Sequence, residues 1–106
     1  MAHYLFRAHY TQAGIQGVLK EGAASRLKAV SELAASVGGR VEVAYWAFGG
    51  DALIMIAELP NNAAAAAAAT RVSASGIGGV TTTVLLTADE IDEARGLGVI
   101  YRPPGA

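Results

Sequence analysis

The stretch YWAFGGDALIMIAELP, residues 45–60, decides the fold. Two apolar runs flank Gly49 and Gly50, and Pro60 closes the second run. Such runs predict two β-strands, and adjacent glycines supply the positive φ angles that tight hairpin turns require. Apolar side chains occupy successive positions and not only alternate ones, so both faces of this hairpin are predicted to be apolar.

Working outward, the sequence predicts further strands and helices around this hairpin. The predicted strands are 3–10, 40–48, 52–59 and 78–87. The predicted helices are 25–39, the run around the seven alanines 63–69, and 88–95. Segment 11–24, interrupted by three glycines, is expected to be an irregular crossing with no more than one helical turn.

Cap residues support these helices. Ser25 is the expected start of the first helix, and Asn61 or Asn62 caps the alanine-rich one. Thr87 and Glu90 have the T-x-x-E spacing of a capping box. The resulting order, β-α-β-β-α-β plus a terminal helix, predicts an α+β ferredoxin-like split βαβ fold with a four-stranded antiparallel sheet and two helices on one face. We expect one domain over 1–95 and an extended carboxy-terminal tail over 96–106, because two prolines exclude a helix there.

Composition excludes several classes of function. Charged residues make up 16% of the 106 residues and the net charge is −1, which disfavours nucleic acid as a partner. The chain has no cysteine, so disulfides and thiolate metal sites are ruled out. No apolar run approaches the roughly 20 residues of a membrane helix, and the amino end does not resemble a signal peptide. We expect a soluble cytoplasmic protein that contacts no membrane.

Strand alternation places apolar side chains on both faces of the sheet. Taking each strand as regular, one face of 40–48 carries Val41, Val43, Tyr45 and Ala47. The second face of the sheet is then expected to hold the following apolar side chains: Trp46, Phe48, Leu53, Met55 and Leu85. Leaving about 600 Å² of such surface in water forgoes roughly 15 kcal/mol of transfer free energy. We therefore expect sheet-to-sheet self-association as a homodimer or higher homo-oligomer, the alternatives being cover by segment 88–106 or by another partner or ligand.

Taken together, these pieces resemble the GYD-domain family of small bacterial and archaeal proteins. The matching stretches are HYLFRAHYTQAGIQGVLKEG, YWAFGGDALIMIAELP, NNAAAAAAATRVSASGIG and TTTVLLTADEIDEA with the trailing YRPPGA. The resemblance spans nearly the whole chain. It implies a ferredoxin-like fold akin to the dimeric α+β barrels, and it implies no activity.

The triplet that names this family departs from its pattern here. Counted back from Pro60 without a gap, Asp51 falls at the position of the tyrosine and Ala52 at that of the aspartate. A slide by one residue keeps Asp51 as the aspartate and gives Gly-Gly-Asp. The tyrosine is missing in either alignment.

Few residues qualify as candidates for chemistry. His3 and His9 lie about 20 Å apart along one strand, so they cannot share a metal ion, and we predict no metal site, no cofactor and no catalytic residue. Arg7 lies mid-sheet, where its charge needs a partner; Glu42 and Glu58 are the candidates. The candidate ligand-binding residues are Arg7, His9, Tyr45, Trp46 and Asp51.

Two functions compete. The first is a non-catalytic homo-oligomeric module that binds itself and could bind a small molecule. The second is a cofactor-free enzyme of the dimeric barrel type, an oxygenase or isomerase acting on a small aromatic or carbonyl compound. In that case His9 is the base, Arg7 stabilises an anion, and Tyr45 and Trp46 are pocket walls. The missing acid–base pair favours the first.

Overall fold

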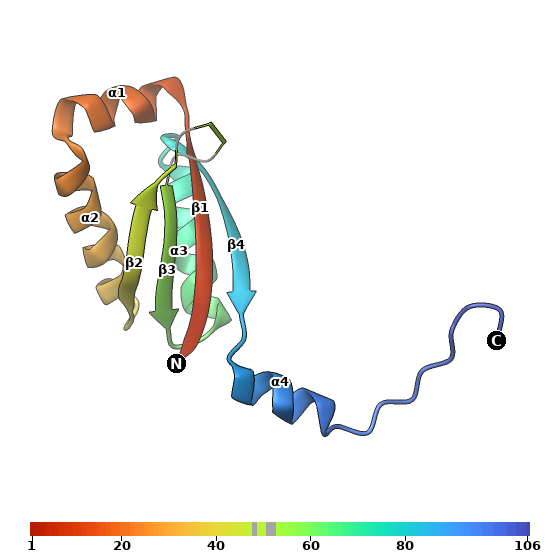
Figure 1. The fold of residues 1–106 in the computed structure, drawn as a ribbon. Coiled ribbons are helices and arrows are strands. Elements are labelled where there is room, and N and C mark those ends of the chain that lie inside the picture. The colour runs from red at the N-terminus through yellow and green to blue at the C-terminus, as the bar shows by residue number, and fades with distance from the viewer. Residues whose placement is uncertain (48, 51–52) are drawn as a thin grey trace.

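The computed structural model describes residues 1–47, 49–50 and 53–106 and shows a sheet with helices on one side (Figure 1). The strands are β1 (Ala2–Tyr10), β2 (Arg40–Trp46), β3 (Leu53–Leu59) and β4 (Gly78–Leu85). The helices are α1 (Gln12–Glu21), α2 (Ala23–Ser36), α3 (Asn62–Ala74) and α4 (Ala88–Arg95).

The four strands form one antiparallel sheet in the order β2-β3-β1-β4. Strand β1 is central, as expected, and pairs with β3 on one side and β4 on the other. This order, with consecutive strands β2 and β3 joined as a hairpin, confirms the predicted α+β ferredoxin-like arrangement. Gly49 in the hairpin turn has a φ of +110°, the backbone conformation for which glycine is needed.

Among the residues described, helices cover one face of this sheet and not the other, and the core lies beneath them. Tyr4 and Leu59, each 1% exposed, are the largest fully buried side chains. The Tyr4 hydroxyl donates a 2.6 Å hydrogen bond to Oδ1 of Asn62, in the first turn of α3. Helix α3 turns Ala65 and Ala68 toward the sheet, and such short side chains permit a close approach of helix to sheet but fill little volume.

The predicted membership of the two faces is wrong in part. Between Val41 and Val43 the β2–β3 register shifts, which marks a bulge in β2. A bulge adds one residue to one strand and so reverses the alternation beyond it. Val43 and Tyr45 therefore lie on the face that carries no helix, called here the open face. Trp46, Leu53 and Met55 lie on the helix-covered face, where the pairs Trp46–Leu53 and Phe6–Met55 are in register.

Two local predictions on helices also fail. Segment 12–21 is a regular helix, with the Thr11 side chain accepting from the amide of Gly14 at its start. Helix α2 begins at Ala23 after Gly22, and Ser25 donates instead to Glu21. Other caps are confirmed: Asn61 Oδ1 accepts from Ala64 N at 2.9 Å, and Thr87 with Glu90 forms the predicted capping box.

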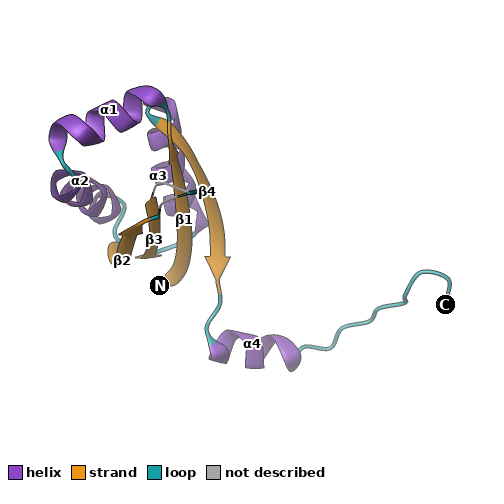
Figure 2. Cartoon of the chain, turned by 45° about the horizontal axis from the view of Figure 1, so that its top comes forward, coloured by secondary structure: helices purple, strands orange, loops and turns teal. Residues whose placement is uncertain are grey.

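Helix α4 and the residues after it project away from the sheet (Figure 2). We call segment 86–106 the arm. The Cα radius of gyration is 16.9 Å, whereas a compact chain of this length has a radius of about 13 Å. The difference reflects the arm, so cover of the open face by the chain's own segment 88–106 is not the arrangement observed.

Candidate functional site

The open face carries an apolar patch on β2, β3 and β1, next to Arg7 in the row of Ile54 and a polar cluster at one end. In the central rows, Leu5 lies opposite Ile56, which lies opposite Val43, and Ile54 lies opposite Tyr45. Leu5, Ile54 and Ile56 are half-buried by their neighbours, whereas Tyr45 is 70% exposed. This concentration of β-branched and aromatic side chains on an uncovered sheet is the feature typical of an interaction surface.

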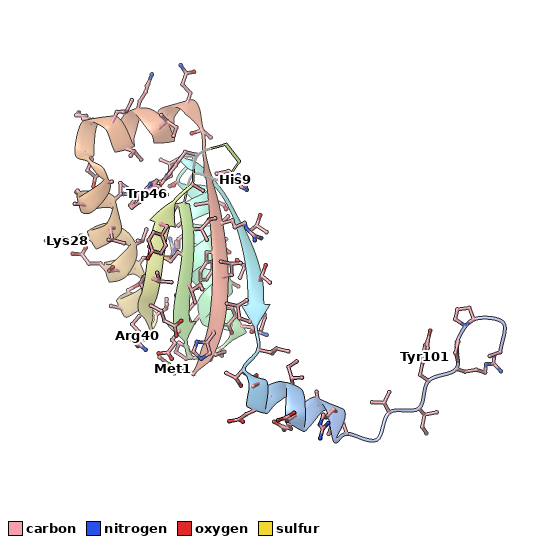
Figure 3. The ribbon with its side chains drawn as sticks, viewed as in Figure 1. Met1, His9, Lys28, Arg40, Trp46 and Tyr101 are labelled. Carbon is pink, nitrogen blue, oxygen red and sulfur yellow. The ribbon has the colours of Figure 1, made fainter. Side chains whose placement is uncertain are left out.

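One end of the open face carries a compact polar cluster. His3 Nδ1 lies 2.8 Å from Oε1 of Glu42, and His3 Nε2 lies 3.8 Å from Oε1 of Glu58. The other oxygen of Glu58 is 2.8 Å from Nε of Arg40. Figure 3 labels Arg40 and Met1 at this end of the sheet. The two glutamates that the sequence offered to Arg7 therefore pair with His3 and Arg40.

The predicted ligand-binding residues do not gather in one place. Arg7 and His9 lie on the open face, with His9 near the end opposite to Arg40 (Figure 3). Tyr45 shares this face, opposite Ile54, which is in turn opposite Arg7. Trp46 lies on the helix-covered face, and Asp51 falls outside the described residues. Arg7, His9 and Tyr45 thus share a surface of one chain, while Trp46 belongs to the other side.

Trp46 has an unsatisfied polar atom. Its indole Nε1 is buried and has no hydrogen-bond acceptor among the residues that the structure describes. Figure 3 shows Trp46 at the end of β2 nearest to α1. An unpaired buried donor costs about 1–3 kcal/mol, so this N–H is a place where an acceptor from outside the chain would gain a hydrogen bond.

An apolar cavity of about 60 Å³ lies between the sheet and helices α2 and α3. Its wall includes Phe6, Leu53 and Val80 from the sheet, and Val30 and Ala69 from the helices. The small side chains of α3 leave this space unfilled. Arg26 of α2 is the charged residue in the lining; its Nη1 lies 3.8 Å from Oε2 of Glu21. The cavity can hold a few waters or part of a small apolar molecule.

The arm displays apolar side chains to solvent. Helix α4 buries none of its residues. The exposed large apolar residues of the arm are Leu86, Ile91, Leu97, Val99, Ile100 and Tyr101. Ile100 is fully exposed and Val99 is 78% exposed. A terminal segment that carries this much apolar surface without packing it on its own chain is suited to packing on a neighbouring chain.

Sequence reasoning missed the polar cluster and the cavity. It compared His3 with His9 along one strand and considered the two glutamates of the neighbouring strands as partners of Arg7 only, not of His3. The signal available was the antiparallel register, which sets His3 opposite Glu58. The cavity had a weaker signal in the alanine run of α3, which was interpreted as close packing only.

Fold and surface together define a class: a small α+β ferredoxin-like domain with one covered and one open sheet face. The family comparison is specific, because the model of the GYD domain matches residues 4–94. The chain belongs to the GYD-domain family. No curated protein and no solved structure matched it.

Among the described residues, no helix combines the length and the apolar character needed to cross a bilayer.

Proposed function

We propose that this protein is a non-catalytic homodimeric module whose two copies pack through the open faces of their sheets. The observation that carries the proposal is the patch formed by Leu5, Ile54, Ile56 and Val43, an apolar surface on a face that no element among the described residues covers. A second copy is the simplest partner, because the same self-complementary patch is then buried on both subunits.

The open face alone is smaller than a stable interface, so we expect the arm to contribute part of the buried area. Strands about 4.8 Å apart and seven residues long at about 3.3 Å each give a four-stranded face of roughly 450 Å². A stable interface buries about 800 Å² on each partner. The arm offers the missing area, because its apolar side chains from Leu86 to Tyr101 are exposed. We propose that each arm packs against the other subunit.

Sedimentation velocity of the full chain tests this proposal. We expect a dimer, and we expect Ile56→Asp to convert it to a monomer with an unchanged far-ultraviolet circular dichroism spectrum, because the new carboxylate would be buried without a partner. Ser31→Asp is the matched control, since it adds the same charge at an exposed position of α2. A wild-type chain that sediments as a folded monomer at its highest soluble concentration would overturn the proposal.

A second candidate function, binding of a small molecule, is favoured by the cavity and by Trp46. The cavity wall is apolar apart from Arg26. The unpaired Nε1 of Trp46 lies on the same face as Leu53, which is opposite it in register and lines the cavity. We propose as ligand a small apolar molecule with a carbonyl or carboxylate group, which would accept hydrogen bonds from the indole or the guanidinium.

The single tryptophan of the chain makes this candidate testable by fluorescence. Titration with small aromatic acids should change the Trp46 emission and raise the melting temperature. Ala69→Met, which would fill the cavity, should abolish both effects, whereas Ala67→Met on the exposed side of α3 should preserve them. Equal responses from the two variants would remove the cavity as the binding site.

A further inference from the structure

We propose that His3, Glu42 and Glu58 form a binding site for one divalent transition-metal ion, with Zn²⁺ as the expected occupant. One imidazole nitrogen and one oxygen from each carboxylate lie within 4.8 Å of one another. The three side chains come from three adjacent strands, β1, β2 and β3. The inference concerns one chain and does not rest on the dimer proposed above.

The spacing of the donor atoms fits such an ion after small side-chain rotations. A tetrahedral zinc ion binds nitrogen and oxygen at about 2.0–2.2 Å, which places its ligand atoms about 3.4 Å apart. His3 contacts the two carboxylates through different nitrogens, with Nδ1 2.8 Å from Glu42 and Nε2 3.8 Å from Glu58, and a metal ion would bind only one of these nitrogens. One nitrogen and one oxygen from each carboxylate lie within 4.8 Å of one another, so side-chain rotations must bring the longest of these separations toward about 3.4 Å.

The sheet holds these donors in place. His3 and Glu58 are directly opposite in the β1–β3 ladder. Glu42 lies at the bulge of β2, between the two register positions Val41 and Val43. All three side chains are partly shielded, with 28%, 26% and 22% of their side-chain surface exposed for His3, Glu42 and Glu58. Donors fixed on paired strands lose little entropy when they bind a ligand.

The charge and the kind of donor select the ion. Two carboxylates face one imidazole, and Arg40 compensates a single oxygen of Glu58, so the cluster favours an added cation. Calcium and magnesium prefer sites made only of oxygen donors. An imidazole nitrogen shifts the preference toward zinc and its neighbours in the first transition series. Three protein donors leave room for a water molecule or for a fourth ligand.

The experiment is a calorimetric titration of the full chain, prepared without an affinity tag and stripped with a chelator, with Zn²⁺ and separately with Mg²⁺. We expect one Zn²⁺ per chain and no heat from Mg²⁺. Co²⁺ serves as a spectroscopic probe, because a site with nitrogen and oxygen donors gives it a visible absorption band that Zn²⁺ should displace. No Zn²⁺ binding, or equal heats from both metals, would overturn the proposal.

Variants identify the ligands. His3→Ala should weaken Zn²⁺ binding by about 100-fold, and Glu42→Gln or Glu58→Gln by about 10-fold or more, since each removes a donor. His9→Ala is the matched control on the same strand and face, and its affinity should stay within about twofold of wild type. Equal losses from His3→Ala and His9→Ala would overturn the assignment.

The variant Arg40→Gln tests whether the cluster is a metal site or only a set of surface ion pairs. It removes a cation that competes for Glu58, so Zn²⁺ should bind about tenfold more tightly. An unchanged or weaker affinity would contradict the role of Glu58 as a ligand. Ile56→Asp should retain one Zn²⁺ per chain; loss of binding there would refute a site built within a single chain.

Discussion

The two faces of this sheet are made from the same strands and have opposite environments. Tyr4 and its neighbour Leu5 differ by one position in β1, yet Tyr4 is 1% exposed under the helices while Leu5 is half-buried on the open face. On the covered face the chain supplies its own cover, through α2 and α3. One face therefore stabilises the fold of each chain, while the other is the face that we propose for assembly.

Leucine truncations on the two faces should give the largest contrast. Leu59→Ala empties a site that is 1% exposed, and we expect it to lower the free energy of unfolding by about 3–5 kcal/mol at every protein concentration. Leu5→Ala on the open face should lower the free energy of unfolding by less than this in dilute solution. The loss should be larger at protein concentrations where the dimer forms. Urea denaturation at several protein concentrations measures both losses. Equal losses that do not depend on protein concentration would contradict the difference between the two faces.

Alanine substitutions at two glycines of α1 should change the stability of the protein in opposite directions. A Cβ at Gly14 would lie 2.1 Å from the carbonyl oxygen of Ile77, whereas a Cβ at Gly17 would meet no atom within 4 Å. Gly14→Ala should therefore destabilise the protein by about 2 kcal/mol through overpacking. Gly17→Ala should stabilise it by about 0.5–1 kcal/mol, because alanine is the better helix former.

Thermal melts of the two alanine variants would check these signs. If both lowered the melting temperature equally, the close packing of α1 against the loop before β4 would be contradicted.

Removing residues 97–106 should affect assembly and spare the covered core. The deletion takes away Leu97, Val99, Ile100 and Tyr101, which are all exposed in the single chain. We expect the dimer to weaken by about tenfold, or 1.4 kcal/mol, with no loss of stability at concentrations where the chain is monomeric. Sedimentation equilibrium gives the association constant. An unchanged constant would exclude this part of the arm from the interface.

The smallest effects should come from two helix caps. Asn61→Ala removes the cap of α3, which packs on the sheet, and should cost about 1 kcal/mol. Thr87→Ala removes the capping box of α4, which lies outside the body, and should change the unfolding of the monomer by less than about 0.5 kcal/mol. Denaturant curves below the dimerisation range compare the two, and a larger loss for Thr87→Ala would show that α4 supports the core.

Strand existence and order could be predicted from the sequence because the apolar runs and their turns are local signals. The irregular crossing predicted for residues 11–24 was wrong, since Thr11 caps α1 and the packing of Gly14 beneath Ile77 outweighs the low helix propensity of glycine. Propensity is a weak guide where such tertiary contacts form.

The face assignment failed for Leu53 and Met55, which were placed on the uncovered face, and for the part of β2 that follows the bulge. Nothing in the letters RVEVAYW indicates an extra residue in the ladder, so regular alternation sent Tyr45 and Trp46 to the wrong faces. The cluster of His3, Glu42 and Glu58 depends on that ladder too. Its members are up to 55 positions apart in the chain, and only the strand register shows that they meet.

The bulge in β2 also determines what kind of mutation can remodel this protein. A substitution at Val43 alters one side chain, but deletion of Glu42 would restore even pleating and keep every later residue of β2 opposite its present partner. The ring of Tyr45 would stay on the open face and the indole of Trp46 on the covered face. The bulge could thus be removed by a change of one codon, with the loss of one side chain and without an exchange of inner and outer surfaces.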